Sequence, residues 1–192
     1  MAFDRDPSAV AARDTPTDAE FVPFRLASLT LSGYDELAPF ILPTFQSEYL
    51  TDLRLAFEDS GATNALIHAS FPLVARSLRR LSLGFCTSAF LPLLQQCTNL
   101  TEISAQWEEL ENVLPALATG VRLQRVEVFI RPWYPRSART GLLGVLEKAL
   151  TDTRLRSCCS LRVSGYRQAD WRKPEGMRFQ SLCEARRIRV EV

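Results

Sequence analysis

The sequence predicts an α/β coil in which each repeated unit supplies one strand and one returning helix or turn. A Leu-x-x-Leu-x-Leu pattern starts at Leu26, Leu50 and Leu78, returns in a weaker form at Leu100, and is clear again at Leu123. These starts are 24, 28, 22 and 23 residues apart, a period typical of stacked repeats. Units of this length bury their leucines only against their neighbours, so they stack in chain order. We therefore expect a leucine-rich-repeat solenoid, a short arc of about six or seven units with parallel strands inside and short irregular helices outside.

Each Leu-x-x-Leu-x-Leu segment is expected to form a short strand, because alternation places its second and third leucines on one face. Apolar residues with helical spacing follow each segment, and the clearest such stretch runs from Leu142 to Leu150. Four of the other stretches contain a proline, namely Pro43, Pro72, Pro92 and Pro115. Proline removes a backbone donor and clashes with the preceding turn, so these outer helices are predicted to be short, kinked or split.

The pattern is weaker beyond residue 150. Two further units are expected there, marked by Cys158, Leu161 and Val163 and by Ala185, Ile188 and Val190. Charged and apolar residues alternate from Arg187 to Val192, as expected for a half-buried terminal strand.

Composition predicts one globular domain with a tail. The chain has 192 residues, of which 46% are hydrophobic, which is enough for one sizeable core. Residues 1–20 have little to bury and are expected to be a disordered tail, whereas residues 21–192 form the repeat domain. No apolar run approaches the roughly 20 residues that cross a bilayer, and the charged start argues against a secretory signal.

The cysteines indicate the redox environment of the protein. The five cysteines are odd in number and lack the paired spacing of zinc ligands, so we expect reduced thiols in a cytoplasmic or nuclear protein. Adjacent Cys158 and Cys159 should point to opposite faces.

The net charge is −7 over residues 1–110 and +8 over residues 111–192. In a linear stack this asymmetry predicts an acidic end and a basic end.

The segments that follow parallel strands all lie on one rim, and two of them indicate a contact surface. Segments 131–136 and 166–173 are the longest and combine aromatic residues with arginine, the types enriched at the energetic centres of interfaces. The predicted partner contacts are Arg131, Trp133, Tyr134, Arg136, Tyr166, Arg167, Trp171 and Arg172. In the alternative interpretation, the tryptophans fold back over the end of the core and the arginines are solvated.

Catalytic interpretations have weaker support. His68 is the only histidine, and no motif places a nucleophile beside it, so a structural role is expected rather than a hydrolase centre. The carboxylates of Glu108, Glu109 and Glu111 suit the start of a helix, where the macrodipole favours negative charge. No phosphate-binding glycine loop occurs. We expect no catalysis, no cofactor and no metal.

Residues 78–103 also carry a family resemblance. Leu-Arg-Arg-Leu-Ser-Leu at 78–83 is followed by Leu-Pro-Leu-Leu at 91–94 and Cys-Thr-Asn-Leu-Thr at 97–101. Over about residues 24–130 the chain resembles the leucine-rich-repeat half of fungal F-box proteins, particularly those of mushroom-forming species. In that family an F-box docks on a ubiquitin-ligase adaptor and the repeats hold the substrate. An F-box segment of the Leu-Pro-x-Glu type is not found before Leu26, so the resemblance implies the substrate-binding part alone.

The leading hypothesis is therefore a protein–protein recognition scaffold with an unidentified protein partner. The alternative is that the basic C-terminal third binds nucleic acid or an acidic protein. No nucleic-acid-binding signature accompanies its arginines.

Overall fold

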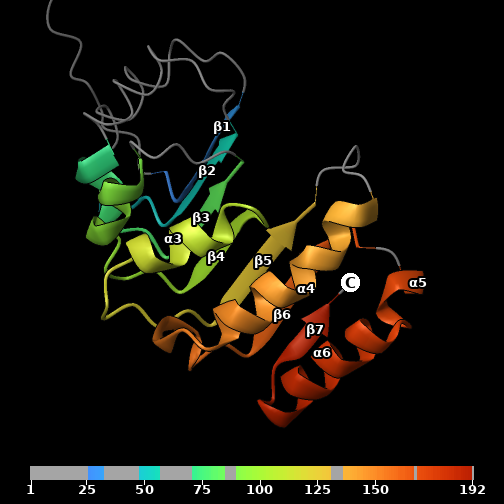
Figure 1. The fold of residues 1–192 in the computed structure, drawn as a ribbon. Helices are drawn as coiled ribbons and strands as arrows, with labels where there is room; N and C mark the ends of the chain where they lie inside the picture. The colour runs from blue at the N-terminus through green and yellow to red at the C-terminus, as the bar shows by residue number, and fades with distance from the viewer. Residues whose placement is uncertain are drawn as a thin grey trace, which may run out of the picture.

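The computed structural model describes residues 26–32, 48–56, 71–84, 90–130, 136–166 and 168–191. These residues form a seven-stranded parallel sheet in which the strand order follows the chain. The strands are β1 (Ser28–Ser32), β2 (Asp52–Ala56), β3 (Arg80–Leu83), β4 (Glu102–Gln106), β5 (Arg125–Phe129), β6 (Ser160–Ser164) and β7 (Arg189–Glu191). Figure 1 shows them side by side, each next to the strands that precede and follow it. The predicted α/β class and parallel strand layer are confirmed. The predicted tail, residues 1–20, and His68 lie outside the described residues.

Helical segments return the chain between strands. They include η2 (Leu91–Gln96), α3 (Leu110–Ala116), α4 (Arg136–Leu150), η3 (Thr153–Leu155), α5 (Gln168–Trp171) and α6 (Pro174–Ala185). Residues 71–75 are also helical. Pro92 lies in the first turn of the six-residue η2, and Pro115 lies near the end of the seven-residue α3. The proline-free α4 has 15 residues, so short outer helices do occur where prolines were expected to limit them. Within the described ranges, every helix is too short or too polar to span a bilayer.

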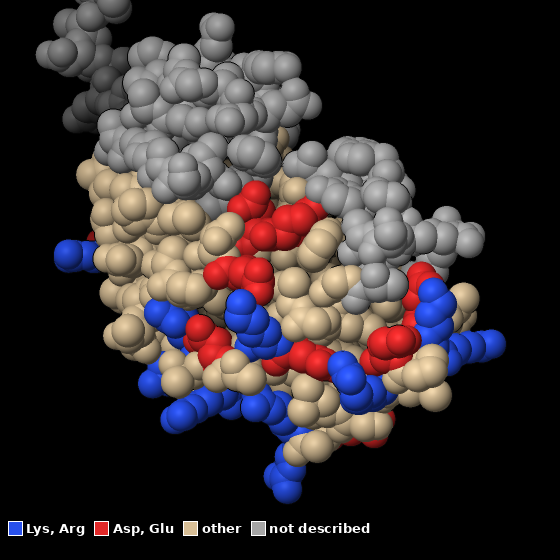
Figure 2. Space-filling model, viewed as in Figure 1, with Lys and Arg blue, Asp and Glu red and all other residues tan. Residues whose placement is uncertain are grey.

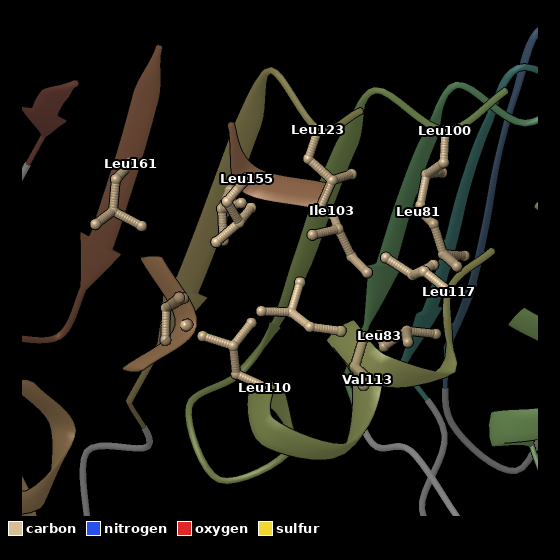
Figure 3. Close-up of a cluster of buried hydrophobic side chains, with 14 of the residues drawn as sticks. Leu81, Leu83, Leu100, Ile103, Leu110, Val113, Leu117, Leu123, Leu155 and Leu161 are labelled. Atoms are coloured by element: carbon tan, nitrogen blue, oxygen red, sulfur yellow. The ribbon is translucent and has the colours of Figure 1, made fainter. Parts of the chain in front are cut away.

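One face of the sheet packs against the helices and forms the core. In β3 and β4 the inward residues Leu81, Leu83 and Ile103 are at most 2% exposed. Figure 3 shows these side chains directed toward Leu110 and Val113 of α3, so the strand and helix layers meet in one apolar contact. Each fully buried leucine of this kind contributes about 1.5–3 kcal/mol through removal of apolar surface from water.

A backbone ladder joins successive units at the point where their strands begin. The carbonyl oxygen of Ala27 accepts hydrogen bonds from the N–H groups of both Thr51 and Asp52, each at 3.0 Å. The Thr51 carbonyl accepts in the same way from Arg79 and Arg80, each at 2.9 Å. The arrangement recurs at the carbonyls of Arg79, Thr101 and Gln124. Each unit therefore fixes where the next strand starts, whatever the length of the chain between them.

The frame predicted for the last unit is wrong by two residues. Val190 pairs in register with Leu161 of β6, whereas the sequence analysis assigned that position to Ile188. The cause is the end of α6, where Arg187 has a φ of 60° and the Ile188 N–H donates to the Cys183 carbonyl at 2.8 Å. The Arg187 N–H donates to the Glu184 carbonyl at 2.9 Å, which completes a Schellman motif. Ile188 is thus used to close the helix and not to open the strand.

Arg154 connects the turn before β6 to the end of α3. Its side chain is only 12% exposed and forms an ion pair with Asp152 at 3.1 Å. Its Nη2 donates to the Leu117 carbonyl at 2.8 Å and to the Pro115 carbonyl at 3.2 Å. Carbonyl groups at a helix end have no partner within the helix, so this guanidinium satisfies groups that would otherwise lack a hydrogen bond.

Replacing Arg154 with methionine is expected to lower the free energy of unfolding by about 3 kcal/mol, because Asp152 loses its ion pair and keeps only the backbone N–H of residue 154, while two carbonyl groups lose a donor. Urea denaturation followed by circular dichroism measures the loss. Arg156→Met is the matched control, since Arg156 is exposed two residues further on. An equal loss in both variants would contradict the structural role of Arg154.

Candidate partner-binding face

The second face of the sheet carries the polar side chains of the strands, and we name it the open face. Alternation along each strand directs these residues away from the core that the helices cover. Their burial pattern is clear in β5, where Val126 and Val128 are buried and the residues between them are partly exposed. The open face comprises Thr30, Asp52, Arg54, Arg80, Ser82, Glu102, Ser104, Arg125, Glu127, Ser160, Arg162, Arg189 and Glu191.

Strand register arranges these side chains in two rows across the sheet. The first row alternates in charge over four adjacent strands, in the order Asp52, Arg80, Glu102 and Arg125. In the second row two small residues lie between charged ones, in the order Arg54, Ser82, Ser104, Glu127 and Arg162. Residues opposite each other on neighbouring strands lie close enough to interact, so charge in these rows is paired across strands.

Four ion pairs use most of the charge on the open face. They are Arg80–Asp52 at 3.1 Å, Arg162–Glu127 at 3.6 Å, Arg125–Glu191 at 3.4 Å and Arg189–Glu191 at 3.9 Å. Arg54 and Glu102 form no ion pair with any residue that the structure describes. One positive and one negative charge are therefore left without a described partner.

A hollow of about 220 Å³ lies on the open face. Ser82 and Ser104 line it and are shorter than Arg54 and Glu127, which flank them in the same row. Its remaining lining consists of Asp52, Arg80, Leu81, Glu102, Ile103, Arg125 and Arg162. Five neighbouring strands, β2 to β6, thus contribute to one polar depression that has room for a side chain of a partner.

The contact residues predicted from the sequence are only partly within the described residues. Residues 131–135 and residue 167 lie outside them, which covers Arg131, Trp133, Tyr134 and Arg167. Arg136 begins α4, and its side chain is not described. The predicted contact between the two rim segments therefore stays a prediction for these five residues.

Tyr166 and Trp171 belong to the core and not to an exposed surface. Trp171 is 3% exposed and Tyr166 is 8% exposed. Their rings meet edge to face with centroids 4.9 Å apart, and the Trp171 ring lies 6.2 Å from that of Phe179. The predicted partner contact of Trp171 stays a prediction. Its ring is buried and packs on α6, which is the packing that the alternative interpretation describes. Arg172 is exposed beside it.

Burial controls the protonation of two thiols in the described chain. Burial raises the pKa of the Cys97 thiol to about 12 and that of Cys183 to about 11, so both stay protonated at neutral pH. Cys158 is buried and Cys159 exposed, as alternation predicted. Cys86 lies outside the described residues. Within those residues, no group of three His, Cys, Asp or Glu side chains could hold a metal ion.

The three neighbouring glutamates differ in environment. Glu109 is the N-cap residue of α3, and Glu111 lies in its first turn, where the sequence analysis expected them. Lys148 contacts Glu111 at 2.9 Å. Both carboxylate oxygens of Glu108 are buried and have no hydrogen-bond partner among the described residues.

Comparison of the chain with family models, with curated proteins and with solved structures finds no match. The role of the open face is therefore inferred from its own side chains. The partner contacts predicted from the sequence lie on loops and do not include this face. The available signal was the residue between the two inward apolar residues of each strand, which is polar in all of β1 to β6.

Replacing Trp171 with alanine is expected to lower the free energy of unfolding by about 3–5 kcal/mol, because the ring is removed from a packed site. Thermal and urea denaturation measure the effect. The neighbouring Arg172→Ala is the control and is expected to change stability by less than about 0.5 kcal/mol. A Trp171→Ala variant as stable as the wild type would place the indole at the surface.

Proposed function

We propose that this chain is a non-catalytic, leucine-rich-repeat recognition scaffold that binds a protein partner on its open face. The single observation that carries the proposal is the polar hollow over Ser82 and Ser104, to which five adjacent strands contribute. Parallel stacking of short units creates an extended surface of this kind without any catalytic constellation. The hollow gives the partner a recess to occupy, and the rows of charged side chains make binding selective for a partner of complementary charge.

Two structural features support the repeat assignment within this proposal. Strand order equals chain order over all seven described strands. The shared-carbonyl ladder recurs at the strand starts, with Ala27, Thr51 and Arg79 in equivalent positions. Both features are expected if each unit folds only against its neighbours.

The resemblance to fungal F-box proteins extends the proposal. It makes this chain the substrate-binding part of an F-box-like ubiquitin-ligase adaptor, with the open face as the surface that holds the substrate. Recovery of a ligase adaptor with the chain is the outcome that would support this extension.

Replacing Ser104 with tryptophan is expected to abolish partner binding, because the indole fills the hollow. Affinity purification from the source cell identifies candidate partners, and calorimetry with each purified candidate measures the dissociation constant. Hydrogen exchange on the complex should show protection of β2 to β6.

Ser181→Trp is the matched control for this experiment, because Ser181 is an exposed residue of α6 on the helical side. Two results would contradict recognition by the open face. One is a partner that binds Ser104→Trp and Ser181→Trp equally well, and the other is a partner that protects only the helices from hydrogen exchange.

A second candidate function is binding of nucleic acid at the edge where the strands begin, which we name the strand-start edge. Exposed arginines precede or open several strands there, namely Arg76, Arg79, Arg122, Arg156, Arg186 and Arg187. Figure 2 shows lysine and arginine side chains gathered along the lower edge of the molecule. A row of cations along one edge is the electrostatic pattern expected for contact with a phosphate backbone.

Replacing both Arg79 and Arg156 with glutamine is expected to weaken binding to single-stranded RNA. Each lost phosphate contact should reduce the slope of log K against log salt by about 0.7, so the slope should fall by roughly 1.4. Fluorescence anisotropy between 50 and 200 mM salt provides the measurement, and Arg172→Gln is the control away from this edge. Unchanged affinity in the double variant would exclude this candidate.

A further inference from the structure

We propose that the partner segment seated on the open face is bipolar, with an acidic residue paired to Arg54 and a basic residue paired to Glu102. The inference rests on the proposed function, and it specifies the chemistry of the partner. The occupant is an extended protein segment that crosses the strands over Ser82 and Ser104.

The first argument is which charges the sheet itself leaves available. Asp52, the acidic neighbour of Arg54 on the same face, is held by Arg80 at 3.1 Å. Glu127, at the far side of the serines, is held by Arg162 at 3.6 Å and by the Ser164 hydroxyl at 3.3 Å. The Arg80 guanidinium lies between two carboxylates in register and pairs with Asp52, which leaves Glu102 without a described cation.

The second argument is the spacing of the two remaining charges. Arg54 is in register with Ser82 and Ser104, and Glu102 lies two residues before Ser104 on the same strand. Two strand spacings across and two residues along the strand separate their Cα atoms by roughly 12 Å. An extended segment advances about 3.3 Å per residue and turns every second side chain to the same side, so its acidic and basic residues should stand four positions apart.

The third argument is the floor of the hollow between the two charges. Ser82 and Ser104 have no described hydrogen-bond partner for their hydroxyls, so both groups can donate to or accept from an overlying main chain. Because serine is small, the main chain of the partner can approach the sheet here while its longer side chains reach Arg54 and Glu102. The hollow therefore suits a polypeptide that lies flat across β2 to β4.

Other occupants fit the charges less well. A polyphosphate backbone would meet the carboxylates of Glu102 and Glu127 in the same hollow, which is repulsive. An apolar segment would cover Arg54 and Glu102 without replacing their hydration, which is costly. A segment that carries an acidic and a basic residue pairs with both Arg54 and Glu102. The reverse order of these residues would place like charges against each other, which weakens binding.

The test uses a phage-displayed library of random 12-residue peptides selected on the full chain. Peptides enriched on the wild type should carry an acidic and a basic residue four positions apart. For a peptide from this set, Arg54→Glu or Glu102→Arg alone should weaken binding by about tenfold or more, because like charges then face each other. The double variant should bind the charge-exchanged peptide about as well as the wild type binds the original.

Two controls separate the inference from the proposed function. Arg178→Glu changes an exposed arginine of α6, on the helical side and away from the face, and should leave the dissociation constant unchanged. Peptides that lose binding on Ser104→Trp but lack the charge pattern, or that tolerate Arg54→Glu as well as Arg178→Glu, would overturn the bipolar partner and leave recognition by the open face standing. Failure to enrich any peptide sensitive to Ser104→Trp would overturn both.

Discussion

Each strand of this sheet takes its position from one carbonyl group of the unit before it, and every other feature of the molecule depends on that link. The Thr51 carbonyl, for example, accepts two successive N–H groups of the next unit at 2.9 Å. With the strand start fixed, alternation decides which side chains enter the core and which reach the open face. The apolar rows and the charged rows are thus two consequences of one backbone arrangement.

Periodic leucines made most of the strand layer predictable. Residues such as Leu53 and Leu81 follow a spacing that few other folds use, and the prolines correctly limit η2 and α3. The last unit was misplaced because Ile188 satisfies both the strand template and a helix-closing position, and only the backbone geometry at Arg187 separates the two. Burial of Trp171 was likewise left open by its sequence context, since an aromatic residue beside arginines suits a core edge as well as an interface.

The candidate site was less predictable than the fold because its essential property is which charges remain unpaired. Arg80 lies in register between Asp52 and Glu102, and nothing in the order of residues says which carboxylate it contacts. Arg154 illustrates the same limit, since its role depends on carbonyl groups that lie 37 and 39 residues earlier in the chain. Composition shows that arginine is abundant, whereas only three-dimensional contacts distinguish structural arginines from those open to a partner.

The constant strand register has a consequence for how such a molecule can vary. The residues in register with Leu29 recur at Leu53, Leu81, Ile103, Val126, Leu161 and Val190. The longest interval among them contains the 15-residue α4, yet β5 and β6 pair across five residues as β4 and β5 do. Insertions on the helical side therefore leave the opposite surface unaltered. The outer layer can diverge in length and sequence while the same columns of side chains continue to form the open face.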